Sequence, residues 1–463
     1  MTARGSGFRH VNSSVAPVPP ERLKWDALLV ALAILLFFQV WAVQHLFGIQ
    51  AVHGVLFVAT CVTLLLFALD RDSRRRLSSL NQPVVRAALG LLLLATLSIP
   101  GSLDPGNSLE LVLQGYLPAV VLMLLVAGSV RGVGDLRRLA WLLIAGLTLY
   151  SVVTIARSWT NITELNDRRW GGILYSVNDL AMLIVSVSPL FLYLWRRPAG
   201  FWTRLLLTAT AVFLTWTFGK AGSRGGFLAL VAVVAYLLLR FRGLSRAKRA
   251  GVAVLVAILV VGLANSDLLE GGGVRENYFQ RIQSLLHPST DYNWSGKSEL
   301  GRLELWKRGI GYVLDHPLFG IGAGAYQVAE GTLAPEARVQ QYGIHFKWSS
   351  AHNALLQVGA EIGIPGLILF VALLVAAFRT LSRIGRGAPG ETAFLAQALI
   401  GCLIGFLVAN MFLTLQWSAY FYTLLGMTVG LAKVASAVHA SAPPAGRVWR
   451  RSVAAPDRRA LTA

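Results

Sequence analysis

The sequence predicts an all-α polytopic membrane protein of about twelve transmembrane helices. Apolar residues make up 55% of the chain and charged residues only 14%, a balance unlike that of a soluble protein of this length. The apolar residues also come in runs of roughly 17–25, the length that crosses a bilayer core as a helix. The net charge of +20 is spread between these runs, which argues against a nucleic-acid-binding patch.

The apolar runs place the spans along the chain. We expect them near residues 27–47, 51–69, 84–100, 110–128, 139–156, 173–195, 203–219, 225–240, 250–265, 352–378, 392–414 and 417–435. The chain then divides into a tail at 1–26, nine spans within 27–265, a large polar loop at 266–351, three spans within 352–435 and a basic tail at 436–463. The loop at 266–351 is large enough to form a small helical subdomain. No cleavable signal peptide is visible before the first span.

The turns between the spans alternate in charge. Every second turn is rich in basic residues, and this set contains Arg71, Arg74, Arg75, Arg76, Arg131, Arg137, Arg138, Arg196, Arg197, Arg204, Arg240, Arg242, Arg246, Lys248, Arg249, Arg379, Arg383 and Arg386. Cytoplasmic loops carry the excess of lysine and arginine. Both termini belong to the basic set, so we expect both in the cytoplasm.

Three segments on the opposite face keep basic residues against this rule. They are 157–172, 219–226 and 266–351, and they hold Arg157, Arg168, Arg169, Lys220, Arg224, Arg275, Arg281 and Arg302. Loops beyond about 60 residues translocate regardless of charge, which accounts for the third segment but not for the two short ones. An anionic substrate is the simplest explanation.

The start of the tenth span carries the best candidate for proton transfer. We expect Ser349 or Ser350 to cap this helix, which puts His352 in its first turn. The positive end of the helix dipole disfavours imidazolium, so His352 is expected to be neutral and able to accept a proton. A capping or interfacial histidine is the alternative.

The same span continues with a polar stripe and with helix-breaking residues. Asn353, Gln357 and Glu361 recur at intervals of four. A carboxylate at this depth is expected to pair with an arginine or to help orient His352. Gly359, Gly363 and Gly366 indicate close helix packing, and Pro365 predicts a kink.

Two arginines are candidates for binding an anion. Arg224 lies in the small-residue turn Gly222-Ser223-Arg224-Gly225-Gly226, where a helix N-terminus and a guanidinium together form a good phosphate site; interfacial snorkelling is the alternative. Residues 299–315 predict an amphipathic helix, and Arg302 flanks its expected apolar stripe of Leu303, Trp306, Ile310 and Val313. A solvated surface charge is the default for Arg302. The following segment, 316–322, reads as a rigid turn with a structural His316.

Metal and cofactor chemistry find no support in the sequence. Cys61 and Cys402 both lie inside apolar runs, where neither suits a disulfide or a metal site. There is no cysteine and histidine cluster, Walker loop or G-x-S-x-G elbow. We therefore expect no metal and no cofactor.

The residues His352-Asn353, nine intervening positions, Gly363 and Gly366 form the pattern HN-x9-GxxG. This pattern resembles the signature of the bacterial O-antigen ligase and polymerase superfamily, which includes protein O-oligosaccharyltransferases. Gly222-Ser223-Arg224-Gly225, and the series from Arg302 through Trp306 to the segment 316–322, resemble two further family elements. The order of these elements and the long loop between the ninth and tenth spans also agree.

The resemblance implies a membrane-embedded, GT-C-like glycosyltransferase that needs no metal. Chain length and layout look most like an O-antigen ligase, which moves a finished glycan from undecaprenyl pyrophosphate to the lipid A–core on the periplasmic face of the bacterial inner membrane. The implied partners are therefore the lipid-linked donor, the lipid A–core acceptor and membrane lipids, with no nucleic acid. By this hypothesis His352 is the general base, and Arg224 and Arg302 bind the pyrophosphate. Secondary candidates are Arg157, Arg168, Arg169, Asn353 and Glu361.

Other functions remain open at this point. An O-antigen or exopolysaccharide polymerase, or a protein O-oligosaccharyltransferase, is the alternative within the superfamily, although the chain is short for the protein-modifying relatives. A transporter of lipid-linked sugars is the main non-enzyme alternative, but no internal repeat of the transporter kind is seen. The sugars, the acceptor hydroxyl and the oligomeric state are not given by the sequence.

Overall fold

The computed structural model describes residues 24–41, 52–75, 81–160, 176–240, 302–333 and 349–441, and these ranges are helical with no strand. In chain order the helices are α1 (Ala27–Trp41), α3 (Val52–Leu69), α4 (Pro83–Leu97), α5 (Pro105–Glu110), η4 (Leu111–Tyr116), α6 (Leu117–Ser129), α7 (Val133–Thr160), α8 (Val177–Trp195), α9 (Phe201–Ala221), α10 (Arg224–Arg240), α13 (Arg302–Asp315), α14 (Tyr326–Thr332), α16 (Ala354–Gly387), α17 (Gly390–Asn410) and α18 (Ala419–Ser441). Two short 3₁₀ turns, Ser73–Arg75 and Ile99–Gly101, lie between them.

The described helices are those of a multi-pass membrane protein. Seven are long and apolar enough to cross a membrane, and large apolar side chains face outward, such as Phe57, which is 71% exposed, and Trp202, which is 77% exposed. Outward apolar side chains are stable where lipid replaces water. The polytopic all-helical fold is confirmed, while the count of twelve spans stays a prediction. The expected ninth span, 250–265, lies outside the described residues.

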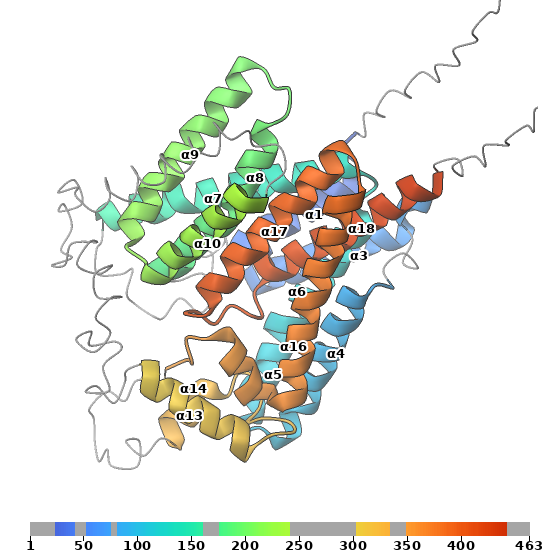
Figure 1. The fold of residues 1–463 in the computed structure, drawn as a ribbon. Helices are drawn as coiled ribbons and strands as arrows, with labels where there is room; N and C mark the ends of the chain where they lie inside the picture. Colours follow the sequence, from blue (N-terminus) through green and yellow to red (C-terminus); the bar gives the residue numbers. More distant parts are fainter. Residues whose placement is uncertain are drawn as a thin grey trace, which may run out of the picture.

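The bundle is built around two long helices from the C-terminal part of the chain. Helix α17 packs along α8 and α10, and α16 packs along both α4 and α17 (Figure 1). Small residues allow the closest approaches: a Cβ atom at Gly405 would lie 3.1 Å from the Cα of Ser186. Such contacts drive helix association in lipid, where the hydrophobic effect between helices is weak. Helix α18 lies along α6.

Hydrogen bonds inside the bundle join hydroxyl groups to partners on other helices. Ser186 donates to the carbonyl of Cys402 at 2.7 Å and accepts from the hydroxyl of Tyr420 at 2.8 Å. Tyr422 donates to Tyr116 at 3.0 Å. Unmade hydrogen bonds are costly where no water is available, so these pairs fix the register between helices.

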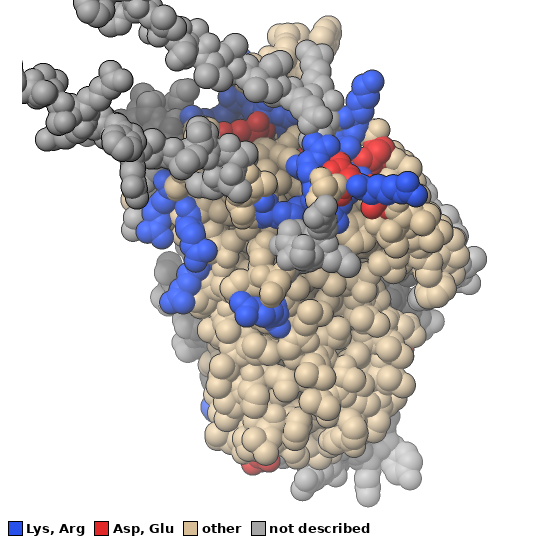
Figure 2. All heavy atoms as spheres, turned by 90° about the vertical axis from the view of Figure 1, so that its right-hand side faces the viewer, with Lys and Arg blue, Asp and Glu red and all other residues tan. Residues whose placement is uncertain are grey.

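The two ends of the bundle differ in charge. At one end Arg75, whose side chain is 3% exposed, forms ion pairs with Asp26 and Asp70, while Arg131 bridges Asp26 and Asp135 at 2.7 and 2.8 Å. Figure 2 shows lysine and arginine gathered at this end, above a broad surface that carries few charges. We call it the basic end. These residues come from turns that the sequence assigned to the cytoplasm.

Helices α13 and α14 lie at the other end, where α16 begins and α4 ends (Figure 1). They belong to the segment 266–351, which was predicted to form a helical subdomain, and the described part is helical. Helix α16 extends to Gly387, beyond the predicted end at 378. Arg379, Arg383 and Arg386 therefore lie on the helix itself and not in a turn after it. Helix α18 likewise continues to Ser441, into the predicted tail.

Candidate functional site

His352 lies immediately before α16 in an unusual backbone conformation. Its φ angle is 49°, and it is the only non-glycine residue with positive φ among those that the structure describes. The left-handed conformation costs a residue with a Cβ atom roughly 1–2 kcal/mol. Such a conformation persists only when its surroundings hold it, and this is frequent at functional sites.

The N-cap of this helix is Asn353, whose side chain accepts a hydrogen bond from the backbone N–H of Leu356 at 3.1 Å. The prediction that Ser349 or Ser350 caps the helix, with His352 in its first turn, is therefore wrong. The cap moved because an asparagine carboxamide reaches the third residue of the turn from this position. His352 still lies at the positive end of α16, just outside it.

Helix α13 holds the residue before His352 in place. The indole N–H of Trp306 donates to the carbonyl oxygen of Ala351 at 3.0 Å. In the preceding peptide unit, the N–H of Ala351 donates to the carboxamide oxygen of Gln357 at 3.3 Å. The backbone leading into His352 is thus bonded from two helices.

Glu361 extends this network into the bundle. Its side chain is fully buried and accepts a hydrogen bond from the carboxamide of Gln357 at 2.7 Å. The backbone amides of Gly324 and Tyr326 face the same carboxylate, yet its Oε2 atom makes no hydrogen bond of good geometry within the described residues. Of the two roles expected for Glu361, the contacts favour orienting the His352 segment, since no arginine in the described ranges pairs with it.

The turn that carries Arg224 folds as the sequence predicts. Gly222 ends α9 in the left-handed conformation, with φ of 57°. The Ser223 hydroxyl then accepts from the N–H of Gly226 at 3.2 Å and caps α10, in which Arg224 is the first residue. The glycines after Arg224 allow close packing: a Cβ atom at Gly225 would lie 3.1 Å from Phe412, and one at Gly226 would lie 2.9 Å from Ala181.

Arg224 and Arg302 come together in the structure. The guanidinium of Arg302 lies over the ring of Phe412, 5.9 Å from its centroid, and the same ring packs against Gly225 beside Arg224. Burial, together with the charge of Arg224, lowers the pKa of Arg302 to about 10. Arg302 remains a cation at neutral pH, in surroundings that an anion would stabilise.

One face of α13 connects these arginines to His352. Arg302 and Trp306 are four residues apart, so they lie one above the other on that face. Trp306 bonds Ala351, the neighbour of His352. Through Arg302 and Trp306, α13 therefore joins the arginine pair to the segment of His352 within one helical turn, although these residues are far apart in sequence.

Residues 209–371 match the family model described as O-antigen ligase. This match supports membership of the O-antigen ligase family. The matched range contains Arg224, Arg302, His352 and Glu361. No curated protein matches the chain.

The segment 316–322 docks into a break in α16. The break is at Gly363, with φ of 77° and ψ of −177°, which agrees with the kink predicted near Pro365. Three backbone hydrogen bonds join the two segments, from Ile321 to Ala360 at 2.9 Å, from Gly322 to Glu361 at 3.0 Å and from Ile364 to Pro317 at 2.8 Å. Because Pro365 has no N–H, the carbonyl of Glu361 is available to Gly322.

Of the two glycines in GxxG, Gly363 serves this docking. A Cβ atom at Gly363 would lie 2.6 Å from the backbone of Leu318, and one at Gly366 would lie 2.7 Å from Ile362 of the same helix. Only Gly359 fits the prediction of close packing between helices, since its Cβ would lie 3.3 Å from Val313 of α13. The predicted rigid turn at 316–322 is confirmed, and its backbone also bonds Leu103.

The apolar stripe predicted for α13 is correct at Trp306 and Val313, which pack inward, and wrong at Leu303 and Ile310. The buried residues of this helix are Leu305, Gly309 and Tyr312, whereas Leu303 and Ile310 are exposed. Gly309 determines which face packs, because without a side chain it admits Leu356 and the Tyr326 hydroxyl. A pattern of apolar residues gives no weight to a glycine, so the sequence misassigned the face.

The remaining candidates are only partly described. Arg157 lies in α7 with its side chain outside the described residues, and Arg168, Arg169, Arg275 and Arg281 lie wholly outside them. Phe412, which contacts the site from the turn between α17 and α18, was not predicted. From sequence alone, an aromatic residue in a turn that contacts a site cannot be distinguished from one at the membrane interface.

Proposed function

We propose that this protein transfers a glycan from undecaprenyl pyrophosphate to the lipid A–core on the periplasmic face of the bacterial inner membrane. Family membership supports glycan transfer at the coarse level. The observation that carries the finer proposal is the convergence of Arg224 and Arg302 beside the segment of His352. Together they supply cations for a pyrophosphate and a base for a hydroxyl.

In this proposal Arg224 and Arg302 bind the leaving group, undecaprenyl pyrophosphate. Pyrophosphate leaves readily once its growing charge is stabilised, and fixed guanidinium groups can supply this stabilisation. Arg302 is partly buried beside Phe412, where the local dielectric strengthens its attraction for an anion. A pyrophosphate between the two arginines would also relieve their mutual repulsion.

His352 acts on the acceptor. Its imidazole takes the proton of the attacking sugar hydroxyl, the oxygen bonds to the anomeric carbon, and the bond from that carbon to the pyrophosphate oxygen breaks. The bond's electron pair leaves with undecaprenyl pyrophosphate, and direct displacement inverts the anomeric centre. General base catalysis of this kind contributes about 10²–10⁴-fold to the rate.

Gln357 and Glu361 act as positioning residues. They do not touch the substrate in this proposal but fix the backbone N–H of Ala351, the residue before His352. A base must lie within hydrogen-bond reach of the proton it accepts. The strained backbone of His352 makes this support necessary, because a freed segment would relax away from φ of 49°.

A reconstituted transfer assay tests the proposal. Purified protein receives the undecaprenyl-pyrophosphate glycan with and without lipid A–core, in EDTA, beside the His352→Ala variant. We expect glycan on the lipid A–core with the wild type and a loss of about 10²–10⁴-fold with the variant. His316→Ala is the matched control, because His316 is exposed and contributes its backbone to the turn.

The other outcomes separate the alternatives. Lengthened lipid-linked chains without a change in lipid A–core would indicate a polymerase, and glycan on an added protein acceptor would indicate a protein O-oligosaccharyltransferase. A lipid-linked sugar transporter would give no covalent change with any acceptor. Loss of activity in EDTA that added metal restores would contradict the metal-independent mechanism.

A further inference from the structure

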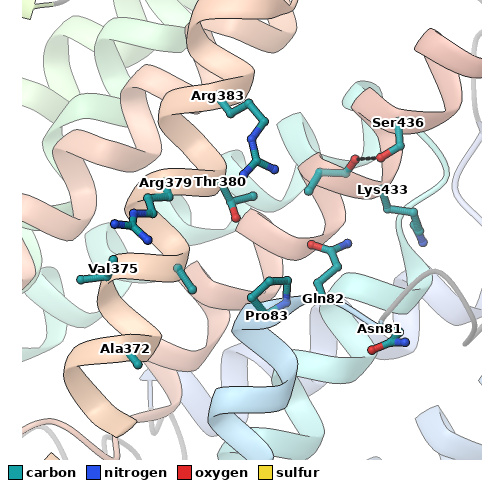
Figure 3. Close-up of a pocket in the computed structure, with 12 residues that line it drawn as sticks. Asn81, Gln82, Pro83, Ala372, Val375, Arg379, Thr380, Arg383, Lys433 and Ser436 are labelled. Atoms are coloured by element: carbon teal, nitrogen blue, oxygen red, sulfur yellow. Dashed lines mark hydrogen bonds between the residues drawn. The ribbon is translucent and has the colours of Figure 1, made fainter. Parts of the chain in front are cut away.

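A cavity of about 660 Å³ lies between α4, α16 and α18, close to the basic end and far from His352 (Figure 3). Gln82 and Pro83 of α4 form one wall, residues 372–383 of α16 the second, and residues 432–436 of α18 the third. His352 and Arg379 are separated by roughly 40 Å of helix. The cavity is therefore no part of the transfer site.

The lining of this cavity is positive. It contains Arg379, Arg383 and Lys433 and no acidic residue. Arg379 and Arg383 are exposed, and neither forms an ion pair within the described ranges. Lys433 is buried and held by the carbonyl of Gly128 at 2.8 Å, which fixes its charge behind the cavity.

The two arginines stand one turn apart at the mouth. Figure 3 shows the Arg383 side chain reaching toward Thr380 and the gap between α16 and α18. The first turn of α4, at Pro83, also opens on this cavity, and it has no side-chain cap. An uncapped helix N-terminus adds partial positive charge to that of the arginines.

An apolar lane continues from the arginines along the outside of α16. Val375 is 39% exposed, Val371 42% and Ile368 63%. Positions 368, 371, 375, 379 and 383 follow intervals of three and four, so they lie along one face of the helix. Cationic groups at the interface with an apolar lane beneath them match the shape of an amphiphile, not that of a soluble anion.

We propose that this cavity binds an anionic glycerophospholipid, with its phosphodiester at Arg379 and Arg383 and an acyl chain along Val375 and Ile368. Basic pockets between transmembrane helices on the cytoplasmic side commonly take such headgroups. A lipid here would join α4, α16 and α18 at the end of the bundle opposite the catalytic segment. The inference does not depend on the transfer reaction.

Native mass spectrometry of the full-length protein in detergent tests this site. Phosphatidylglycerol and phosphatidylcholine of identical acyl chains are titrated separately onto the wild type and onto the double variant Arg379→Gln/Arg383→Gln. We expect the wild type to prefer phosphatidylglycerol and the double variant to lose that preference, by roughly fivefold for each arginine. Arg386→Gln is the matched control, since Arg386 is exposed on the same helix but does not line the cavity.

Three results would overturn the proposal. The wild type could bind both lipids equally, Arg386→Gln could lose the preference as fully as the double variant, or excess inorganic phosphate could displace the bound lipid, which would indicate a site for small anions. The variant Val375→Asn adds an independent measurement, because a polar group in the lane should weaken both lipids. Equal thermal unfolding of all variants establishes that the changes are local.

Discussion

The backbone strain of the candidate site is found at one residue, His352. A left-handed φ of 49° is held by the helix cap at Asn353 on one side and by two hydrogen bonds to the backbone of Ala351 on the other. Evolution has many residues to choose from at such a position, and glycine or asparagine would be less strained. A histidine at this position supports the proposal that its imidazole acts in the reaction.

The strain predicts how two substitutions differ. His352→Gly should unfold at a higher temperature than His352→Ala in the same detergent, because glycine adopts positive φ without penalty and alanine does not. The expected difference in the free energy of unfolding is about 1 kcal/mol. Both variants should lose transfer alike. An alanine variant as stable as the glycine variant would mean that the segment relaxes and holds no strain.

If the arginines bind pyrophosphate, a lysine in place of Arg224 should not restore full transfer activity. Arg224→Lys keeps the positive charge but loses the planar fork that binds two phosphate oxygens at once. We therefore expect impaired transfer in Arg224→Lys and weaker donor binding in Arg224→Ala and Arg302→Ala. Binding of the lipid-linked donor, measured by titration, should be nearly unchanged in His352→Ala. Equal donor affinity in all of these variants would exclude the pyrophosphate role.

Gln357 and Glu361 predict a change in rate without a change in affinity. Glu361→Gln keeps an oxygen that can accept from Gln357, whereas Glu361→Ala and Gln357→Ala remove the link to Ala351. Displacement of a catalytic group by about 1 Å can cost roughly 10²-fold. The two alanine variants should lower kcat with little change in the donor's KM, and Glu361→Gln should retain most activity. Equal loss in Glu361→Gln would show that the carboxylate charge itself is required.

At the scale of elements, α13 has to pack correctly for the site to form. Its Gly309 faces Tyr326 and Leu356, and a Cβ atom there would lie 2.6 Å from the Tyr326 hydroxyl, while Gly311 has open space around its Cβ position. Gly309→Ala should therefore lower both stability and transfer. Gly311→Ala should raise stability by roughly 0.5–1 kcal/mol and leave transfer unchanged.

Thermal unfolding and the transfer assay together check this pair of variants. A neutral Gly309→Ala would show that α13 packs by another face, such as the stripe of Leu303 and Ile310 that the sequence predicted. The position of Trp306 against Ala351 would then also be in doubt, because both depend on the same helix rotation.

The break in α16 interrupts the helix and also gives the segment 316–322 a place to bind. Gly363 and Pro365 remove helical hydrogen bonds, and the segment 316–322 replaces them with its own backbone. The turn also bonds Leu103 near the end of α4. Backbone that leaves the helix inside a membrane protein must find partners, so this interlock ties the transfer end of the bundle to both α4 and α16.

At the scale of the whole molecule, periodicity and charge sufficed for the helices and for the order of the turns. Residue type also predicted the kink near Pro365, whereas the roles proposed for Arg224 and Arg302 came from residue type together with the family resemblance and stay predictions. The predictions were wrong where a tertiary contact determines the structure. Asn353, and not Ser349 or Ser350, caps α16, and packing at Gly309 determines which face of α13 is buried. Phe412 joins the arginines only because α17 returns beside α10, which no local pattern encodes.

The topology of the molecule predicts which end meets which compartment. If the proposed function holds, the end with α13 is periplasmic and the basic end is cytoplasmic, as the positive-inside rule requires. Cysteine introduced at Gly311 and at Gly387 samples the two ends, since both positions have open space around them. The background replaces the natural Cys61 and Cys402 with alanine, because Cys61 is exposed on α3.

Labelling with a membrane-impermeant maleimide should distinguish the ends in intact cells. Gly311→Cys should react once the outer membrane is permeable, and Gly387→Cys should react only after the inner membrane is opened. A hydrophilic reagent cannot cross the apolar core, so the difference reports sidedness and not reactivity. The reverse pattern would place the arginines and His352 in the cytoplasm, where no lipid A–core acceptor has yet been exported, and would exclude periplasmic ligation while leaving the family's glycan transfer chemistry intact.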